Sequence, residues 1–206
     1  QRFPITLRAA VGGGTKLAAQ HSQSPYSMFM NLAGLKIILP STPYDMKGLL
    51  KAAIRDDNPV MSFESNRLMG LEGDVPDDDY TVPIGKADVK REGTDITVIA
   101  IAWMVQEALA AAQILDKEDI SVEVVDPRTL VPMDSETIRA SVRKTGRLLV
   151  ADEAGPTAGA SAEIISIATE DPETFKTLRA PVSRVCAHDA PIPYSPVLED
   201  YVFPNR

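Results

Sequence analysis

Residues that cross-link proteins or bind nucleic acids are scarce in this sequence. Only one cysteine, Cys186, occurs among the 206 residues, which excludes an intrachain disulfide and a zinc site made of cysteines. Lys and Arg number 21 against 29 Asp and Glu, and the resulting net charge of −8 disfavours a nucleic-acid-binding surface. No apolar run approaches the roughly 20 residues that cross a bilayer. We therefore expect a globular protein with neither a nucleic-acid nor a membrane partner.

The chain also lacks an initial methionine and a signal-type segment. It opens at Gln1 and runs directly into the extended segment RFPITLR. A chain that starts inside a strand is expected to continue from earlier sequence, so we predict that upstream residues are missing. The single cysteine favours the cytoplasm of a bacterium or archaeon, or the matrix of an organelle.

Strand-like and helix-like segments alternate through the first third of the sequence. Leu35–Leu39 is a run of strand length that is apolar except for Lys36, and it is ended by Pro40. Residues 44–56 carry apolar side chains at 46, 49, 50, 53 and 54, which is the spacing of an amphipathic helix. Val60–Phe63 is the next strand. This order of buried strands and helices predicts a mainly parallel sheet.

A polar stretch separates this unit from a second one. Residues 66–80 are rich in Gly, Pro and Asp, and the run Asp77–Asp79 is interpreted as a solvated loop rather than a metal site. The alternation then resumes, with strands at 96–101, 122–125, 148–150 and 182–185 and helices at 104–115, 134–143 and 161–169. We predict two α/β domains, residues 1–78 and 79–206, of which the first is incomplete.

His21 is the strongest candidate for acid–base chemistry. It lies in the polar string Gln20–Gln23, between a glycine cluster and a short helix, and a neutral imidazole can both donate and accept a proton. The alternatives are a purely structural histidine and a Ser–His pair with Ser22, which the absence of a G-x-S-x-G motif disfavours. The only other histidine, His188, lies in a proline-rich loop and is interpreted as a packing residue.

The end of the predicted helix at 44–56 is a candidate cation site. Free carbonyl groups at a helix end, together with the carboxylate of Asp56 and the amide of Asn58, offer oxygen ligands to a hard cation. An ordinary exit from helix to loop is the alternative interpretation. The cluster Gly12–Gly14, in contrast, matches neither of the glycine patterns that bind phosphate groups.

Five strings in a fixed order resemble one family. They are AAQHSQS at 18–24, GLKIILPSTPYDMKGLLKAAIRDDNPV at 34–60, VEVVDPRTLVPMD at 122–134, SVRKTGRLLVADE at 141–153 and RVCAHDAPIPYS at 184–195. Together they resemble the β subunit of the E1 component of 2-oxo acid dehydrogenase complexes, a family that includes pyruvate, branched-chain 2-oxo acid and acetoin dehydrogenases. The resemblance extends over nearly the whole chain.

The resemblance implies an α/β fold in two parts: the back half of a thiamine-diphosphate pyrimidine domain, followed by a transketolase C-terminal-like α/β/α sandwich. His21 matches the family's catalytic histidine, which implies proton transfer while lipoamide is acylated. A structural potassium ion bound by several family members implies a site at Ile5, Ala53, Ile54, Asp56 and Asn58. The glutamate that activates thiamine is expected upstream of this chain.

The same resemblance implies cofactors and partners. Thiamine diphosphate with Mg²⁺ is shared with an E1 α subunit in an α2β2 heterotetramer, and the α subunit holds the magnesium and the diphosphate. The implied reaction is oxidative decarboxylation of a 2-oxo acid, or cleavage of acetoin, with acyl transfer to the lipoamide of an E2 core. The enzyme would then be active only with its α subunit.

Two other functions stay open at this point. One is a non-catalytic module for dimerisation and E2 docking. The other is a relative of transketolase or deoxyxylulose-phosphate synthase, against which the presence of only two histidines argues. The acyl donor is also open, because Asn31, Ala33, Ser65 and Met69 depart from the residues usual in the E1 β family.

Overall fold

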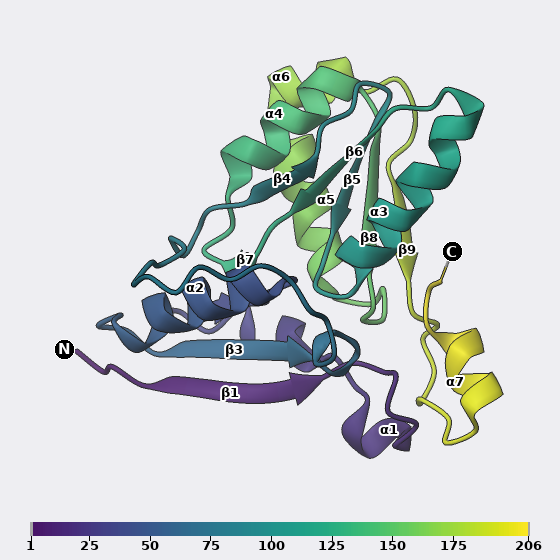
Figure 1. Ribbon diagram of the computed structural model, residues 1–206. Coiled ribbons are helices and arrows are strands. Elements are labelled where there is room, and N and C mark those ends of the chain that lie inside the picture. The colour runs from purple at the N-terminus through teal and green to yellow at the C-terminus, as the bar shows by residue number, and fades with distance from the viewer. Residues whose placement is uncertain (1, 206) are drawn as a thin grey trace.

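Two β-sheets organise the chain, and helices pack against both (Figure 1). The computed structural model describes residues 2–205. The first sheet has the order β1-β3-β2-β7, with strands β1 (Thr6–Val11), β2 (Lys36–Ile38), β3 (Val60–Ser65) and β7 (Thr129–Val131). β1 and β2 run parallel to β3, whereas β7 runs antiparallel to β2. The predicted parallel pairing is confirmed, and β7 adds an antiparallel strand from far along the chain.

The second sheet has the order β4-β6-β5-β8-β9. Its strands are β4 (Asp88–Arg91), β5 (Ile96–Ala100), β6 (Val122–Asp126), β8 (Leu148–Asp152) and β9 (Ser183–Cys186). All neighbouring strands are parallel except β4 and β6. The sequence does not predict β4 or β7, since DVKR is too polar and TLV too short to show a strand pattern.

Helices connect the strands. They are α1 (Ala18–His21), α2 (Pro43–Ile54), α3 (Met104–Leu115), α4 (Ser135–Thr145), α5 (Ala160–Glu170), α6 (Pro172–Thr177) and α7 (Pro196–Val202), with 3-10 helices η1 (Pro25–Phe29), η2 (Asn66–Leu68) and η3 (Asp116–Glu118). The start of α2 follows from its sequence, because the Thr42 hydroxyl accepts a hydrogen bond from the Asp45 amide at 3.0 Å. Within residues 2–205, no helix combines the length and apolarity that crossing a membrane requires.

The second sheet lies between two layers of helices, as Figure 1 shows. On one face, Val105 of α3 packs in a cluster that includes Val124 of β6. On the other face, Ile138 of α4 and Ile164 of α5 pack in a cluster that includes Val125. Consecutive residues of a strand point to opposite faces, so Val124 and Val125 pack against different layers of helices. This arrangement is an α/β/α sandwich.

One hydrophobic core continues from the first sheet into the second. Val11, Ile37 and Phe63 from the first sheet belong to the same buried cluster as Ile99 and Val150 from the second. The two sheets are therefore held in a fixed relation by apolar packing as well as by the pairing of β7 with β2.

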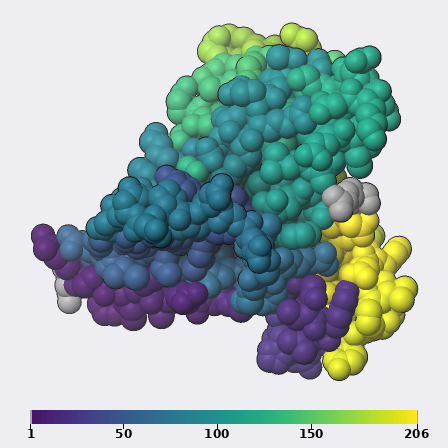
Figure 2. Space-filling model, viewed as in Figure 1, coloured from purple at the N-terminus to yellow at the C-terminus, as the bar shows by residue number. Residues whose placement is uncertain are grey.

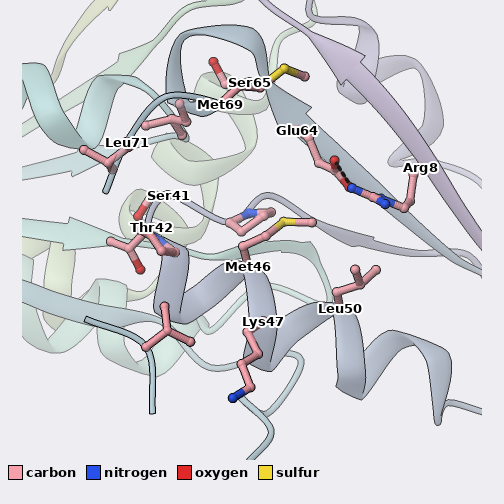
Figure 3. Close-up of a pocket in the computed structure, with 14 residues that line it drawn as sticks. Arg8, Ser41, Thr42, Met46, Lys47, Leu50, Glu64, Ser65, Met69 and Leu71 are labelled. Atoms are coloured by element: carbon pink, nitrogen blue, oxygen red, sulfur yellow. Dashed lines mark hydrogen bonds and ion pairs between the residues drawn. The ribbon is translucent and has the colours of Figure 1, made fainter. Parts of the chain in front are cut away.

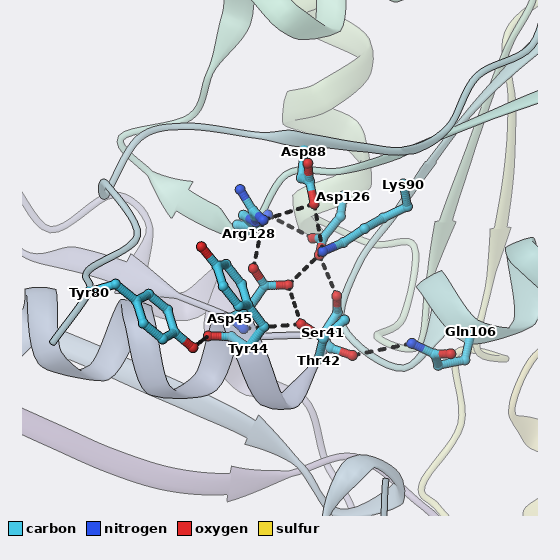
Figure 4. Close-up of polar contacts among 10 residues, drawn as sticks. All are labelled: Ser41, Thr42, Tyr44, Asp45, Tyr80, Asp88, Lys90, Gln106, Asp126 and Arg128. Atoms are coloured by element: carbon cyan, nitrogen blue, oxygen red, sulfur yellow. Dashed lines mark hydrogen bonds and ion pairs between the residues drawn. The ribbon is translucent and has the colours of Figure 1, made fainter. Parts of the chain in front are cut away.

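A buried ion network strengthens the same junction (Figure 4). The fully buried carboxylate of Asp45 in α2 lies 2.6 Å from Lys90 Nζ and 2.7 Å from an Arg128 nitrogen. Both cations also contact Asp88, at 2.7 Å and 2.8 Å. Burial raises the pKa of the neighbouring Asp126 to about 6, although the nearby Lys90 lowers it. α2 is thereby joined to β4 and to the segment after β6.

Candidate functional site

His21 lies at the carboxyl end of the first parallel sheet. β1 and β3 are in register, with Val11 opposite Ser65, so both strands end at the same edge. The chain leaves β1 through the glycine loop (Gly12–Gly14) and enters α1, whose last residue is His21. In open α/β sheets the carboxyl ends of parallel strands are the usual place for ligands.

A hollow of about 490 Å³ opens at this edge, and we call it the His21 hollow. Its lining residues are Ala9, Ala10, Val11, Leu17, Ala19, Gln20, His21, Gln23, Pro25 and Asn66. Most of these side chains are small, apolar or amides, and the lining contains no Lys, Arg, Asp or Glu. The hollow therefore suits a neutral, flat, polar group better than a phosphate.

The backbone around the hollow is held by hydrogen bonds that close the loop. The Gly12 amide donates to the Gln23 carbonyl at 3.1 Å, and the Asn66 side-chain amide donates to the Gly12 carbonyl at 3.0 Å. Gly12 and Gly14 have positive φ angles of 81° and 97°, which glycine adopts without a steric penalty. The glycine cluster thus serves a sharp change of direction and not phosphate binding.

The Ser–His alternative is wrong for these two neighbours. Ser22 is fully buried, and its hydroxyl has no hydrogen-bond partner among residues 2–205. His21 is exposed in the hollow. Opposite environments for adjacent side chains exclude a nucleophile–base pair between them.

Buried acids at the end of β8 lie beneath this region, and the sequence analysis does not identify them. The Tyr26 hydroxyl donates to Asp152, and the Ala154 amide donates to the same carboxylate at 2.9 Å. Burial, and then the charge of Asp152, raises the pKa of Glu153 to about 8, against the lowering effect of Arg67. The only sequence signal is two consecutive acids directly after an apolar strand.

The residues of the predicted potassium site lie near one another at the end of α2 and the start of β1. The Ile5 carbonyl accepts the Val60 amide at 2.9 Å, and the Ala53 carbonyl accepts the Asp56 amide at 3.2 Å. Lys36 Nζ lies 2.5 Å from the Asp56 carboxylate, which Asn58 also contacts. Burial alone raises the pKa of Asp56, but these hydrogen bonds lower it overall.

Lys36 thus already supplies one positive charge at Asp56, and an ion there would bind through the remaining lone pairs of backbone carbonyls. Ile54 ends α2, and its side chain is exposed. Among residues 2–205, no group of three or more His, Cys, Asp or Glu side chains is arranged to hold a metal ion. The potassium site stays a prediction that rests on carbonyl oxygens.

The other two sequence features have ordinary surroundings. Asp77–Asp79 is exposed, and Asp79 pairs with Lys51 and Arg55. The His188 ring stacks on Tyr201 with 5.0 Å between ring centroids, which agrees with a packing role.

A second cavity, of about 430 Å³, lies between α2 and the segment after β3 (Figure 3). Met46 and Leu50 of α2 line one side and Met69 the other, and a two-bond ion pair between Arg8 and Glu64 lies at its edge. Ser65 also lines it. Two of the positions that depart from the E1 β family, Ser65 and Met69, therefore lie in this cavity and not in the His21 hollow.

Comparison with known proteins identifies both halves of the chain. Residues 85–206 match the family "Transketolase, C-terminal domain", and residues 1–70 match the family "Transketolase, pyrimidine binding domain". The chain belongs to the transketolase C-terminal domain family. The predicted fold, a part of a pyrimidine domain followed by an α/β/α sandwich, is confirmed. The predicted boundary between residues 78 and 79 stays a prediction.

Relatives named as β subunits of an oxidoreductase and of two dehydrogenases match almost all of this transketolase-family chain. It is 47% identical to the β subunit of acetoin:2,6-dichlorophenolindophenol oxidoreductase of Bacillus subtilis (strain 168), over 99% of the chain and 59% of the relative. It is 48% identical to the 2-oxoisovalerate dehydrogenase β subunit and 45% identical to the pyruvate dehydrogenase E1 β subunit of the same organism, over 98% of the chain and 62% of each relative. The chain thus spans about three fifths of these relatives.

These relatives confirm the resemblance to E1 β subunits, and they lend no support to the docking-module or sugar-phosphate alternatives. A solved split-gene transketolase, described as an inactive β4 tetramer, superposes with a TM-score of 0.79 at 24% identity, over 98% of the chain and 62% of that structure. This likeness shows the shared fold.

Proposed function

We propose that this chain is the part of an E1 β subunit that carries the catalytic histidine. The E1 enzyme would act on a 2-oxo acid or on acetoin with thiamine diphosphate. The observation that carries the proposal is the position of His21, exposed in a hollow at the carboxyl end of β1 in a pyrimidine-binding domain. The relatives named for three donors differ by only three percentage points in identity. The acyl donor is therefore left to experiment.

The surroundings of His21 fit the neutral end of thiamine diphosphate. Small side chains at Ala9 and Ala10 leave room for a flat ring, and the amides of Gln20, Gln23 and Asn66 can hydrogen-bond to ring nitrogens. No basic residue lines the hollow to receive a diphosphate. This agrees with an E1 α subunit that holds the diphosphate and Mg²⁺, so we propose that the active site forms only between the two subunits.

Thiamine diphosphate, if bound here, would supply the nucleophilic carbon and the electron sink that cleavage of the donor requires. His21 has a separate task. Its exposed imidazole can hold a proton and donate it to the lipoyl sulfur that is released when the disulfide ring opens. The glycine loop and α1 keep the imidazole at the mouth of the hollow, where a lipoyl arm from an E2 core can reach it.

The decisive assay uses the full-length subunit co-expressed with its neighbouring α subunit. Thiamine-dependent reduction of an artificial electron acceptor is measured with pyruvate, 3-methyl-2-oxobutanoate and acetoin. We expect activity with one donor and its loss without the α subunit. His21→Ala is expected to slow acylation of a lipoyl domain by about 100-fold or more. A well-folded complex that is silent with all three donors would contradict the proposal.

Two further proposals depend on the same assignment. We propose that K⁺ binds at Ile5, Ala53, Ile54, Asp56 and Asn58, which predicts a higher melting temperature in KCl than in choline chloride at equal ionic strength. The loss of this difference in Asp56→Ala would support it, and equal melting in both salts contradicts it.

We also place the protein in a bacterial or archaeal cytoplasm or in an organelle matrix.

A further inference from the structure

Helix α1, which carries His21, cannot fix its own position. It is four residues long, contains no buried residue and has no side-chain N-cap. A single helical turn is unstable in isolation, so contacts from elsewhere must determine where it lies. The question is which part of the molecule supplies them.

The C-terminal segment lies directly beside α1. Figure 1 shows α7 next to α1, and Figure 2 shows the yellow C-terminal segment against the purple one. The contacts fall on the glycine loop. A Cβ atom on Gly13 would lie 2.4 Å from the ring of Phe203, and one on Gly12 would lie 2.5 Å from a carboxylate oxygen of Glu153. The loop is therefore packed against residues of the C-terminal domain with no room for a side chain.

Glu199 of α7 makes the polar part of this contact. Its side chain is fully buried. The Gly14 amide donates to Glu199 Oε1 at 2.6 Å, and Lys16 Nζ lies 3.5 Å from the same oxygen. Lys16 also pairs with the adjacent Asp200. One buried carboxylate thus binds both the backbone and the side chain of the segment that leads into α1.

The bound segment is held in an unfavourable backbone conformation. Lys16 and Ala18 both have a φ of +57°, in the left-handed region that costs residues with a Cβ roughly 1 kcal/mol or more each. Such conformations persist only where the surrounding structure enforces them, and they gather at functional sites. Glu199 contacts Lys16, one of the two strained residues, and Gly14, two residues before it, so its contacts lie at the start of the strained turn.

We propose that Glu199 is a positioning residue for His21. By holding Gly14 and Lys16, its carboxylate fixes the strained turn that sets α1 in the His21 hollow, so the C-terminal helix α7 determines the rate of the step that His21 serves. The inference rests on the role proposed for His21 above. It assigns to α7 a task that is distinct from packing, because α7 itself does not line the hollow.

The test uses the full-length subunit in complex with its α subunit and compares Glu199→Ala, Glu199→Gln and His21→Ala. A matched control is Glu163→Ala, which removes an exposed glutamate from α5. Three quantities are measured: turnover with the artificial acceptor, acylation of a lipoyl domain, and amide hydrogen exchange across residues 12–24. The first two separate the step that needs His21 from the step that does not.

Glu199→Ala is expected to lower kcat for lipoyl acylation by at least about tenfold, since displacements of about 1 Å can cost up to about 100-fold. Turnover with the artificial acceptor should change by less than about twofold, and exchange at Gly14 and in α1 should become faster. Glu199→Gln keeps an acceptor for the Gly14 amide and should recover much of the loss. Glu163→Ala should resemble the unmodified protein in all three.

Each other outcome has a defined meaning. If His21→Ala blocks acylation but Glu199→Ala does not, the positioning role is overturned and the proposed function stands. If Glu199→Ala lowers the rates of both steps equally, the loss comes from general structural damage and the positioning role is overturned. If His21→Ala leaves acylation unchanged, the role proposed for His21 is contradicted, and so is the positioning role of Glu199.

Discussion

Asp45, which is fully buried, and Arg128, which is largely buried, form an ion pair between two parts of the chain that are far apart in sequence. Asp45 opens α2, and Arg128 follows β6, yet the carboxylate and the guanidinium are 2.7 Å apart. Lys90 reaches the same carboxylate at 2.6 Å. Two cations share one buried anion here, so removal of that anion should weaken the junction.

Asp45→Ala is expected to destabilise the protein by about 3–5 kcal/mol, because two largely buried cations lose the fully buried one of the two carboxylates that they share and keep only the more exposed Asp88. Urea unfolding followed by circular dichroism measures this difference. Asp79→Ala is the matched control, since it removes the exposed partner of Lys51 and Arg55 and should cost much less. Equal effects of the two substitutions would show that the buried network does not stabilise the junction.

Tyr26→Phe tests a second buried polar contact between the two units. The Tyr26 hydroxyl donates to the buried Asp152, and its ring packs edge-on against Phe63 with 6.0 Å between centroids. Phenylalanine keeps the ring contact and removes only the donor. We expect a loss of about 1–3 kcal/mol in the free energy of unfolding. The half-buried Tyr80, whose hydroxyl donates to the Tyr44 carbonyl at 2.9 Å, should lose less than about 1 kcal/mol when changed to Phe.

The sequence predicts most of the strands and helices that surround these contacts, but not the contacts themselves. The helix at 44–56 shows a clear helical period because it buries one face, and Leu35–Leu39 shows an apolar run of strand length. His21 is a candidate because of its polar neighbours, and the resemblance to E1 β subunits makes it the predicted catalytic residue. In contrast, Glu153 and Glu199 meet the glycine loop across about 140 and 185 residues of sequence. No local sequence pattern indicates a partner at that separation. The pairing of β7 with β2 cannot be predicted from the sequence for the same reason.

Glu153 gives the protein a specific dependence on pH. Its pKa is raised from 4.5 to about 8 in the folded state, chiefly by burial. Between these values the folded protein keeps a proton that the unfolded chain releases, so stability falls as pH rises, by about 1.4 kcal/mol per unit at most, and levels off above pH 8. Asp126, whose pKa is raised to about 6, also makes stability fall as pH rises, but only below about pH 6.

Glu153→Gln cannot ionise and should abolish the part of this slope that lies between pH 6 and pH 8. Urea midpoints measured for both proteins at half-unit intervals of pH give the comparison. Because the histidines are unchanged in the variant, their contribution cancels in the difference between the two curves. Parallel curves would mean that Glu153 is ionised in the folded protein throughout this range.

Two glycines with similar φ angles separate the effect of strain from the effect of contact. Gly12 and Gly34 have φ angles of +81° and +89°, but a Cβ on Gly34 would meet nothing within 4 Å, whereas one on Gly12 would lie 2.5 Å from Glu153. Gly34→Ala should cost only the conformational penalty of about 1–2 kcal/mol. Gly12→Ala must in addition displace a buried carboxylate, and we expect at least about 1 kcal/mol more.

The double variant Gly12→Ala with Glu153→Ala identifies the cause of that excess. Removing the carboxylate makes space for the new methyl group, so the double variant should recover the excess, and the coupling energy between the two sites should be about 1 kcal/mol or more. Strictly additive losses would mean that the glycine loop moves freely away from the C-terminal domain. Such a loop could not transmit the position of α7 to His21.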